Sequence, residues 1–290
     1  MRFAVSRFSI FNLKRMTLDS HVHFWKYNKE DYSWIDRDMK VLRKDYLPTD
    51  IELTLKRNNI DGCIAVQATT TALETRFLAE LAKTHPVIKG VVGWADLRSP
   101  EVAKYLDELR QYPSIAGIRH IVQSEPDDFL YNEKFRAGIS LLSEYNYTFD
   151  ILIFPRQLKA ATDLVAAFPQ QQFILDHCAK PNIKGRELEP WKAAIGELAA
   201  HPNVACKLSG LFTEAEWKQW SPHDFYPYLD VVFGAFGTGR LMFGSDWPVM
   251  LLSGIYVQWK SLIEKYMEEI LPEEQENVMG LNARKIYGVI

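Results

Sequence analysis

Eight short apolar runs recur along the chain, and a segment with helical character separates each run from the next. Strict alternation of this kind favours a parallel sheet whose strands are joined by crossover helices. Eight such units favour closure into a barrel over an open doubly wound sheet. A barrel of this type takes about 250 residues, and the chain has 290. We therefore expect an α/β protein that forms one (β/α)₈ TIM barrel. The runs cover 18–25, 63–69, 88–97, 115–122, 147–154, 172–179, 204–211 and 240–247.

Helix signals lie between the runs. Ser99 is predicted to be an N-cap with Pro100 at the first helical position. Further helices are expected over 188–200 and 273–287. Two apolar stripes at helical spacing are expected to face the core. These stripes are Val102, Leu106 and Leu109 in one helix, and Leu73, Phe77 and Leu81 in a helix over 72–84.

Charge and cysteine content exclude several classes of protein. The formal net charge is −3, and no basic stripe is present, so we expect no nucleic-acid partner. No segment approaches the roughly 20 apolar residues of a membrane span, so no membrane partner is expected. Cys63, Cys178 and Cys206 are odd in number, and each lies in an apolar run. This pattern is typical of reduced core thiols in a cytoplasmic protein.

The first fifteen residues differ from the rest of the chain. They contain four basic residues and no acidic one. Arg7 interrupts their apolar stretch and no small-residue cleavage site follows, which does not fit a secretory signal. Met16 lies just before the first apolar run. We expect residues 1–15 to be an extension outside the core, and residues 16–290 to form the barrel.

Four polar residues lie where a barrel places its chemistry. His21 and His23 are two apart on the first strand, so both side chains should face the interior. His177 and Asp246 lie near the ends of the sixth and eighth runs. Catalytic groups of such barrels come from the C-terminal ends of different strands. An H-x-H pair alone is equally typical of ordinary core histidines, but all four residues together predict an active site.

This constellation resembles the amidohydrolase superfamily, of the amidohydrolase 2 type, whose barrels carry H-x-H on strand one and an Asp on strand eight. The resemblance covers roughly 18–290, and it is closest to the branch of sugar-lactone and 2-pyrone-4,6-dicarboxylate lactonases. It implies a hydrolase that opens a sugar-acid lactone such as L-fuconolactone, L-rhamnonolactone or galactonolactone. The supporting segments are DSHVHFW, RKDYLPTDI, GIRHIVQ, LDHCAKP, KLSG, FGSDWP and LNARKIYG.

One departure from the superfamily bears on the metal. Binuclear members bridge two metals with a carboxylated Lys or a Glu on a middle strand. The fourth run here offers Arg119 and His120 instead, and the fifth run contains no histidine. We therefore expect either one divalent metal, preferably Zn²⁺, with an open position for water, or no metal at all. The candidate ligands are His21, His23, His177 and Asp246.

The chemistry of an activated ester assigns roles to these residues. Asp246 is the candidate general base for the attacking water and the later proton donor to the leaving alkoxide. The three histidines would orient that water, or bind a metal that lowers its pKa. Arg119 would polarise the lactone carbonyl, or alternatively form a salt bridge with a neighbouring acid.

Four residues are candidate substrate contacts. Trp25, in the aromatic loop 24–48, is expected to stack on the sugar ring, or alternatively to pin this loop to the barrel rim. Lys207 is expected to reach the substrate or to complete the packing of the barrel interior. Lys180 is a weaker candidate. His120 points away from Arg119 in a regular strand, so it is either a weak candidate or a core histidine.

Two other functions are compatible with the sequence. A metal-dependent decarboxylase or amide hydrolase could use the same barrel, because fold does not fix function. A non-catalytic barrel that only binds a small ligand is the third hypothesis, and the complete set of three histidines and one aspartate argues against it. Cys178 and Cys206 are expected to be core residues and not nucleophiles. A homodimer and a monomer both remain open.

Overall fold

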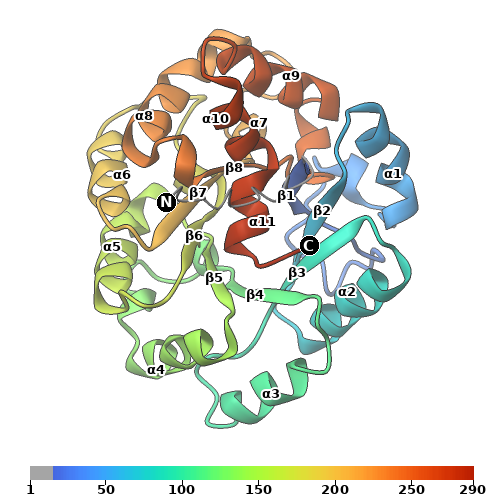
Figure 1. Cartoon of the computed structure of the whole chain (residues 1–290), viewed down its shortest axis with the longest axis vertical. Helices are drawn as coiled ribbons and strands as arrows, with labels where there is room; N and C mark the ends of the chain where they lie inside the picture. The colour runs from blue at the N-terminus through green and yellow to red at the C-terminus, as the bar shows by residue number, and fades with distance from the viewer. Residues whose placement is uncertain (1–15) are drawn as a thin grey trace, which may run out of the picture.

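The computed structural model describes residues 16–290, so the predicted extension over 1–15 lies outside the described residues. Eight parallel strands form one sheet in the order β1 to β8. A parallel bridge between Val22 and Trp247 joins the two ends of the sheet and closes the barrel. The predicted (β/α)₈ barrel is therefore confirmed (Figure 1). The strands are β1 (Leu18–Val22), β2 (Gly62–Val66), β3 (Ile88–Gly93), β4 (Ile115–His120), β5 (Thr148–Ile151), β6 (Phe173–Leu175), β7 (Val204–Leu208) and β8 (Leu241–Phe243).

Helices surround the ring of strands, and one of them crosses its centre in Figure 1. No helix within residues 16–290 is long and apolar enough to span a membrane. The helices are α1 (Pro48–Arg57), α2 (Ala72–Thr84), α3 (Val102–Leu109), α4 (Glu133–Leu142), α5 (Leu158–Ala167), α6 (Trp191–Ala199), α7 (Leu211–Glu214), α8 (Tyr226–Phe236), α9 (Tyr256–Tyr266), α10 (Pro272–Glu276) and α11 (Asn282–Ile286). The segment predicted as one helix over 273–287 is thus α10 and α11, separated by a π-helical turn.

Two helix predictions need correction. α3 begins at Val102, because the Ser99 hydroxyl caps a preceding turn by accepting from the amide of Glu101. In α2 the buried face is rotated from the predicted stripe, and Leu73 is 76% exposed. Glu74 turns inward instead, because its carboxylate accepts hydrogen bonds from backbone amides at the end of β2.

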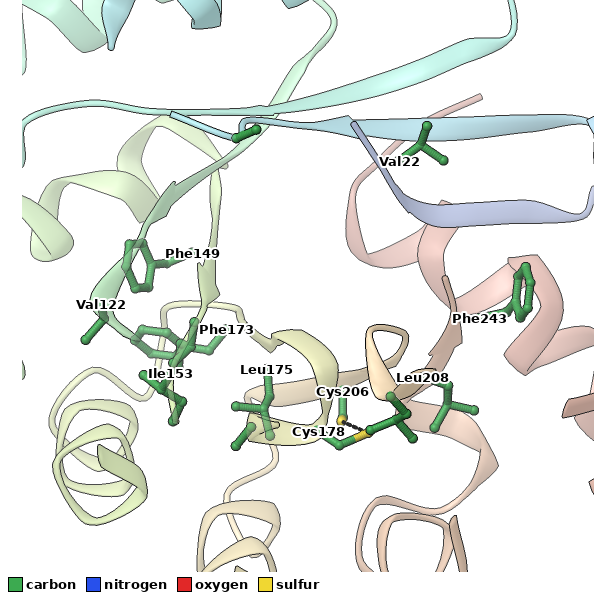
Figure 2. Packing of buried hydrophobic residues seen from close by; sticks show 14 of the residues in the cluster. Val22, Val122, Phe149, Ile153, Phe173, Leu175, Cys178, Cys206, Leu208 and Phe243 are labelled. Atoms are coloured by element: carbon green, nitrogen blue, oxygen red, sulfur yellow. Dashed lines mark hydrogen bonds between the residues drawn. The ribbon is translucent and has the colours of Figure 1, made fainter. Parts of the chain in front are cut away.

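The outer surface of the strands packs against the helices. Figure 2 shows this layer for β5 to β8, where Phe149, Phe173 and Phe243 fill the space outside the sheet. Cys178 and Cys206 lie in the same layer with their sulfur atoms 3.8 Å apart. All three cysteines are buried and free, as predicted. This apolar layer holds the strands that carry the polar groups of the interior.

A second apolar cluster contains residues from seven of the eight strands. Its strand residues are Leu18, Ile64, Val66, Val92, Ala116, Ile174, Ala205 and Met242. Ala283, Tyr287 and Val289 pack against them, and α11 lies across the centre of the ring (Figure 1). The C-terminal segment therefore closes one end of the barrel, and polar chemistry is left to the other end.

A bulge in β1 sets the direction of its histidines. The pairing of β1 with β2 shifts between Asp19 and Val22. Asp19 holds this irregularity, because its carboxylate accepts from the amides of His21 (3.1 Å) and Ser245 (2.8 Å). Tyr256 donates to the other carboxylate oxygen at 2.9 Å. Asp19 thus ties the start of the site to the segment after β8.

Candidate active site

His21 and His23 lie together inside the barrel, as their spacing predicts. Both are buried, and their Nε2 atoms are 3.1 Å apart. The Nδ1 atom of His23 lies 2.7 Å from the carbonyl oxygen of Val66. A carbonyl only accepts, so Nδ1 of His23 carries a hydrogen, and in the neutral form of the ring Nε2 carries the lone pair. In that form, Nε2 of His23 can bind a cation.

Asp246 follows β8 and faces this pair. Its amide donates to the carbonyl of His21 at 2.9 Å, and its Oδ1 lies 3.2 Å from Nε2 of His23 and 3.8 Å from Nε2 of His21. Burial alone would raise the pKa of Asp246, but nearby His177 and His23 hold this pKa below its ordinary value. Asp246 is therefore a carboxylate at neutral pH.

His177 reaches the same place from the end of β6. Its ring centre is 4.4 Å from that of His21, and its Nδ1 lies 2.8 Å from the hydroxyl of Ser209. Burial lowers the pKa of His177 to about 4, so the ring is neutral at pH 7. A Cβ on Gly210 would lie 2.4 Å from Nδ1 of His177, so this close approach requires glycine.

The backbone is strained where the site is formed. Non-glycine residues with positive φ are uncommon, and they cluster at functional sites. Residues 177–180 and Asp246 account for five of the nine such positions within 16–290. The site is therefore held in a conformation that the surrounding fold imposes.

Beneath the histidines lies a network of buried charges that the sequence analysis missed in part. Lys207 contacts Asp150 at 2.6 Å and Asp176 at 3.0 Å. Asp176 also contacts Arg119 at 2.8 Å. Both cations then approach His21: Nζ of Lys207 lies 3.2 Å from its Nδ1, and Nη1 of Arg119 lies 3.3 Å from its Nε2. The two cations and two carboxylates balance, and Asp246 is a further acid that faces His21 and His23 directly.

The positions of the side-chain nitrogen and oxygen atoms of His21, His23 and Asp246 fit the binding of a single divalent ion. Oδ1 of Asp246 and the lone pair of His23 are both acceptors and lie 3.2 Å apart, so a proton or a metal ion is needed between them. Zn²⁺ binds nitrogen and oxygen at about 2.0–2.1 Å in a tetrahedron, which separates neighbouring ligand atoms by about 3.3 Å. The three distances among His21, His23 and Asp246 are 3.1, 3.2 and 3.8 Å. A second group, His21, Asp176 and His177, also has ligand atoms within 4.8 Å of one another.

Trp25 does not take the position predicted for a substrate contact. Its ring is fully buried, and its indole nitrogen donates to the carbonyl of Lys44 at 2.9 Å. Tyr32, Trp34 and Tyr46 pack around it. The structure therefore favours the alternative reading, in which Trp25 anchors the loop to the barrel.

For Lys207 and Arg119, too, the structure favours the alternative to substrate contact, which was packing of the interior for Lys207 and a salt bridge for Arg119. The side chain of Lys207 is fully buried, so it completes the packing of the interior. Arg119 is 2% exposed and pairs with Asp176, and its Nη2 donates to the backbone carbonyl of Gln67. Both cations touch His21 and leave little surface for a substrate.

His120 and Lys180 lie in different surroundings. His120 stacks on Phe129 and contacts Glu125 at 2.9 Å, so it packs outside the strand as a core histidine. Lys180 is a partly exposed cation, and its charge acts on His177 and Asp246. Its Nζ lies 3.9 Å from Glu214, whose pKa burial raises. Lys180 and Glu214 are thus the charged pair that borders the histidine cluster.

Asp150 and Asp176 escaped the sequence analysis, although one signal was present. Each is a lone charge within an apolar run, and buried charges are almost always paired. Their partners, Lys207 and Arg119, are each 57 residues away along the chain. Only the closed barrel identifies these pairs.

Comparison with known proteins agrees with this geometry. The family profile described as amidohydrolase matches residues 18–289. The chain is 39% identical to an L-fucono-1,5-lactonase of Burkholderia multivorans over 94% of this chain and 96% of that protein. It is 34% identical to an L-fucono-1,5-lactonase of Burkholderia ambifaria over 94% and 95%. A crystal structure of an amidohydrolase from Burkholderia multivorans with bound zinc superposes with a TM-score of 0.92 at 39% identity, and covers 95% of this chain and 100% of that one.

Proposed function

Because the chain belongs to the amidohydrolase family, we propose that it is a lactonase that opens a sugar-acid lactone such as L-fucono-1,5-lactone. The observation that carries this proposal is the carboxylate of Asp246 facing His21 and His23 at the C-terminal end of the barrel. A buried carboxylate beside imidazoles suits the activation of one water molecule. The likeness to two lactonases supports a lactone as the substrate.

Asp246 is the proposed proton acceptor and donor of the reaction. Its lowered pKa keeps it ionised at neutral pH, so it can take a proton from water as that water attacks the lactone carbonyl. The C–O bond of the ring then breaks, and the proton on Asp246 passes to the ring oxygen that leaves. The products are the open hydroxy acid and the regenerated carboxylate, and no other reactant is needed.

The histidines orient the water and are the proposed ligands of a metal. His21, His23 and Asp246, with His177 next to them, would hold one Zn²⁺, which would lower the pKa of a bound water to about 7. The fit between Asp246 and the lone pair of His23 supports this ligand set. His177, held by Ser209, limits the position that the lactone can take.

Lys180 is the proposed partner of the lactone oxygen atoms. It is the cation beside Asp246 that is partly open to solvent, whereas Arg119 is engaged with Asp176. A cation near the carbonyl stabilises the negative charge that develops there during attack. Arg119 acts through its contact with His21 and Asp176.

The free buried thiols support a reducing compartment, and we propose the cytoplasm.

Proton release on a panel of aldonolactones tests the proposal. The protein is assayed before chelation, after chelation and after zinc is restored, with its metal content measured each time. Rapid hydrolysis of one sugar lactone that Asp246→Asn abolishes is the expected result. Asp107→Asn, on the exposed face of α3, is the matched control and should keep full activity. Activity that survives chelation would refute the zinc ligand set, and no turnover of any lactone would refute the lactonase.

A further inference from the structure

Three segments that follow successive strands bring unlike side chains together beside His177. Phe154 comes after β5, Lys180 after β6, and Glu214 at the end of α7, which follows β7. Nζ of Lys180 lies 5.6 Å from the ring centre of Phe154 and 3.9 Å from Oε1 of Glu214. An aromatic ring, a cation and a carboxylate therefore lie within reach of one small ligand.

The backbone that packs against His177 also positions Glu214. The hydroxyl of Ser209 lies 2.8 Å from Nδ1 of His177, and Gly210 passes so close to the same ring that a Cβ there would lie 2.4 Å from it. α7 begins at the next residue and ends at Glu214. The carbonyl of Glu214 accepts from the amide of Lys184 at 2.9 Å, which joins α7 to the loop after β6. Glu214 is thus fixed relative to the histidine cluster.

The side chain of Glu214 is partly open to solvent and lies near Asp246. It is 20% exposed, and the side chain of Lys180 is 18% exposed. Burial raises the pKa of Glu214 against the lowering effect of Lys180, and the charge of Asp246 adds to the rise, so the two carboxylates are within electrostatic reach. The 3.9 Å between Lys180 and Glu214 exceeds the length of a hydrogen bond. Neither group therefore saturates the other, and both can still bond a ligand.

These three groups suit a neutral sugar ring better than an anion. A carboxylate only accepts hydrogen bonds and an ammonium only donates them, whereas a hydroxyl does both. Adjacent hydroxyls can thus donate to Glu214 and accept from Lys180, while the C–H face of the ring lies on Phe154. A carboxylate on the ligand would meet Lys180 already neutralised by Glu214, and Glu214 and Asp246 would both repel it.

We propose that Glu214 determines substrate specificity: its carboxylate binds ring hydroxyls of a neutral polyhydroxy lactone and repels lactones that carry a free carboxylate. The inference rests on the proposed lactonase function and adds the substrate class to it. Glu214 takes no part in breaking the ester bond, which is left to Asp246. Its loss should therefore appear in KM and in the choice between substrates.

Steady-state kinetics on two matched lactones tests this role. The pair is L-galactonolactone, which shares the ring configuration of L-fuconolactone, and the same lactone with its primary alcohol oxidised to a carboxylate. Glu214→Gln should raise KM for the neutral lactone about tenfold, because hydrogen bonds to an ionised group are about twice as strong as neutral ones. Since like charges disfavour the wrong ligand, the preference of wild type for the neutral lactone should also fall about tenfold or more.

Two further variants separate the charge of Glu214 from its position and from general effects. Glu214→Asp keeps the charge and shortens the side chain, so it should keep the discrimination against the carboxylate lactone while raising KM for the neutral one. Glu216→Gln is the matched control. It removes a charge from the same segment, where the side chain is 47% exposed and pairs with Lys184, and both KM values should stay at those of wild type.

Binding without turnover keeps the test independent of the lactonase. Calorimetry measures the affinity for both lactones in an Asp246→Asn background, where Glu214→Gln should again lower the preference for the neutral one. An unchanged preference in Glu214→Gln, an equal change in Glu216→Gln, or lost discrimination in Glu214→Asp overturns the role of Glu214. A wild type that prefers the carboxylate lactone, or binding of neither lactone, overturns it too. Binding of the neutral lactone without turnover of any lactone by wild type refutes the lactonase instead, and the binding constants still decide the role of Glu214.

Discussion

Removing the charge of Lys207 should destabilise the fold far more than removing the whole pair that it forms with Asp150. Both side chains are fully buried, with Nζ and Oδ2 2.6 Å apart. Lys207→Met keeps most of the unbranched side chain and removes its charge. Asp150 then loses the lysine that neutralises it, and Asp176 keeps Arg119, at 2.8 Å, as its cationic partner.

The magnitude follows from the burial of the pair. Loss of one partner of a buried ion pair costs about 3–5 kcal/mol, because the other charge stays in a medium of low dielectric constant. Replacing both partners with neutral residues is often close to neutral. The variant Lys207→Met/Asp150→Asn should therefore be more stable than Lys207→Met, although it carries one more substitution. Asp150→Asn alone should cost less than Lys207→Met, because Asp176 still lies 3.0 Å from the ammonium.

Urea unfolding at neutral pH, followed by tryptophan fluorescence, measures the free energy of unfolding of each variant. The matched control is Lys159→Met/Asp163→Asn, an ion pair on α5 with lysine and aspartate side chains 74% and 38% exposed. Both its single variants should stay within about 1 kcal/mol of wild type. If the two Lys207 and Asp150 substitutions add, or if Lys207→Met costs as little as Lys159→Met, the argument from buried charge is wrong.

Three further predictions test other parts of the site. Asp246→Asn should lower kcat by at least about 100-fold, the range of general acid–base catalysis, and a kcat within tenfold of wild type would contradict its role. Trp25→Phe should lower stability by about 1 kcal/mol through the lost bond to Lys44, with KM unchanged; a raised KM at full stability would restore the stacking hypothesis. Burial raises the pKa of Glu74 from 4.5 to about 7. A raised acid pKa stabilises the fold at low pH, so this contribution, up to about 3 kcal/mol, should fade from pH 4.5 to 7. Glu74→Gln should lack this pH dependence in urea unfolding, and an identical pH profile would refute the shift.

The sequence predicted what depends on periodicity and topology. The alternation of runs identified the barrel, and the position of His21, His23, His177 and Asp246 near strand ends was enough to bring them together. Closure between β1 and the segment after β8 places Asp246 beside the pair. These inferences hold because parallel strands present their C-terminal ends at one edge.

What failed depends on side-chain packing. A buried aromatic anchor and a substrate platform have the same sequence signature, so the sequence left both interpretations of Trp25 open, and its burial favours the anchor. The face of α2 was misjudged at Leu73 because Glu74, a polar residue, points inward to two backbone amides. Asp150 escaped notice because its hydrogen-bond donors, Lys207 and Tyr287, are distant along the chain.

The apolar cluster closed by α11 has a consequence for synthesis. The ribosome completes all eight strands before it adds residues 282–289. Until those residues emerge, the end of the barrel that α11 will cover is an apolar opening, and Asp150 lacks its hydrogen bond from the hydroxyl of Tyr287. Exposed apolar surface of this kind invites aggregation during folding. Packing of residues 282–289 is thus the last step in closing the barrel. A chain truncated before Tyr287 should leave this apolar cluster exposed and remain bound to chaperones.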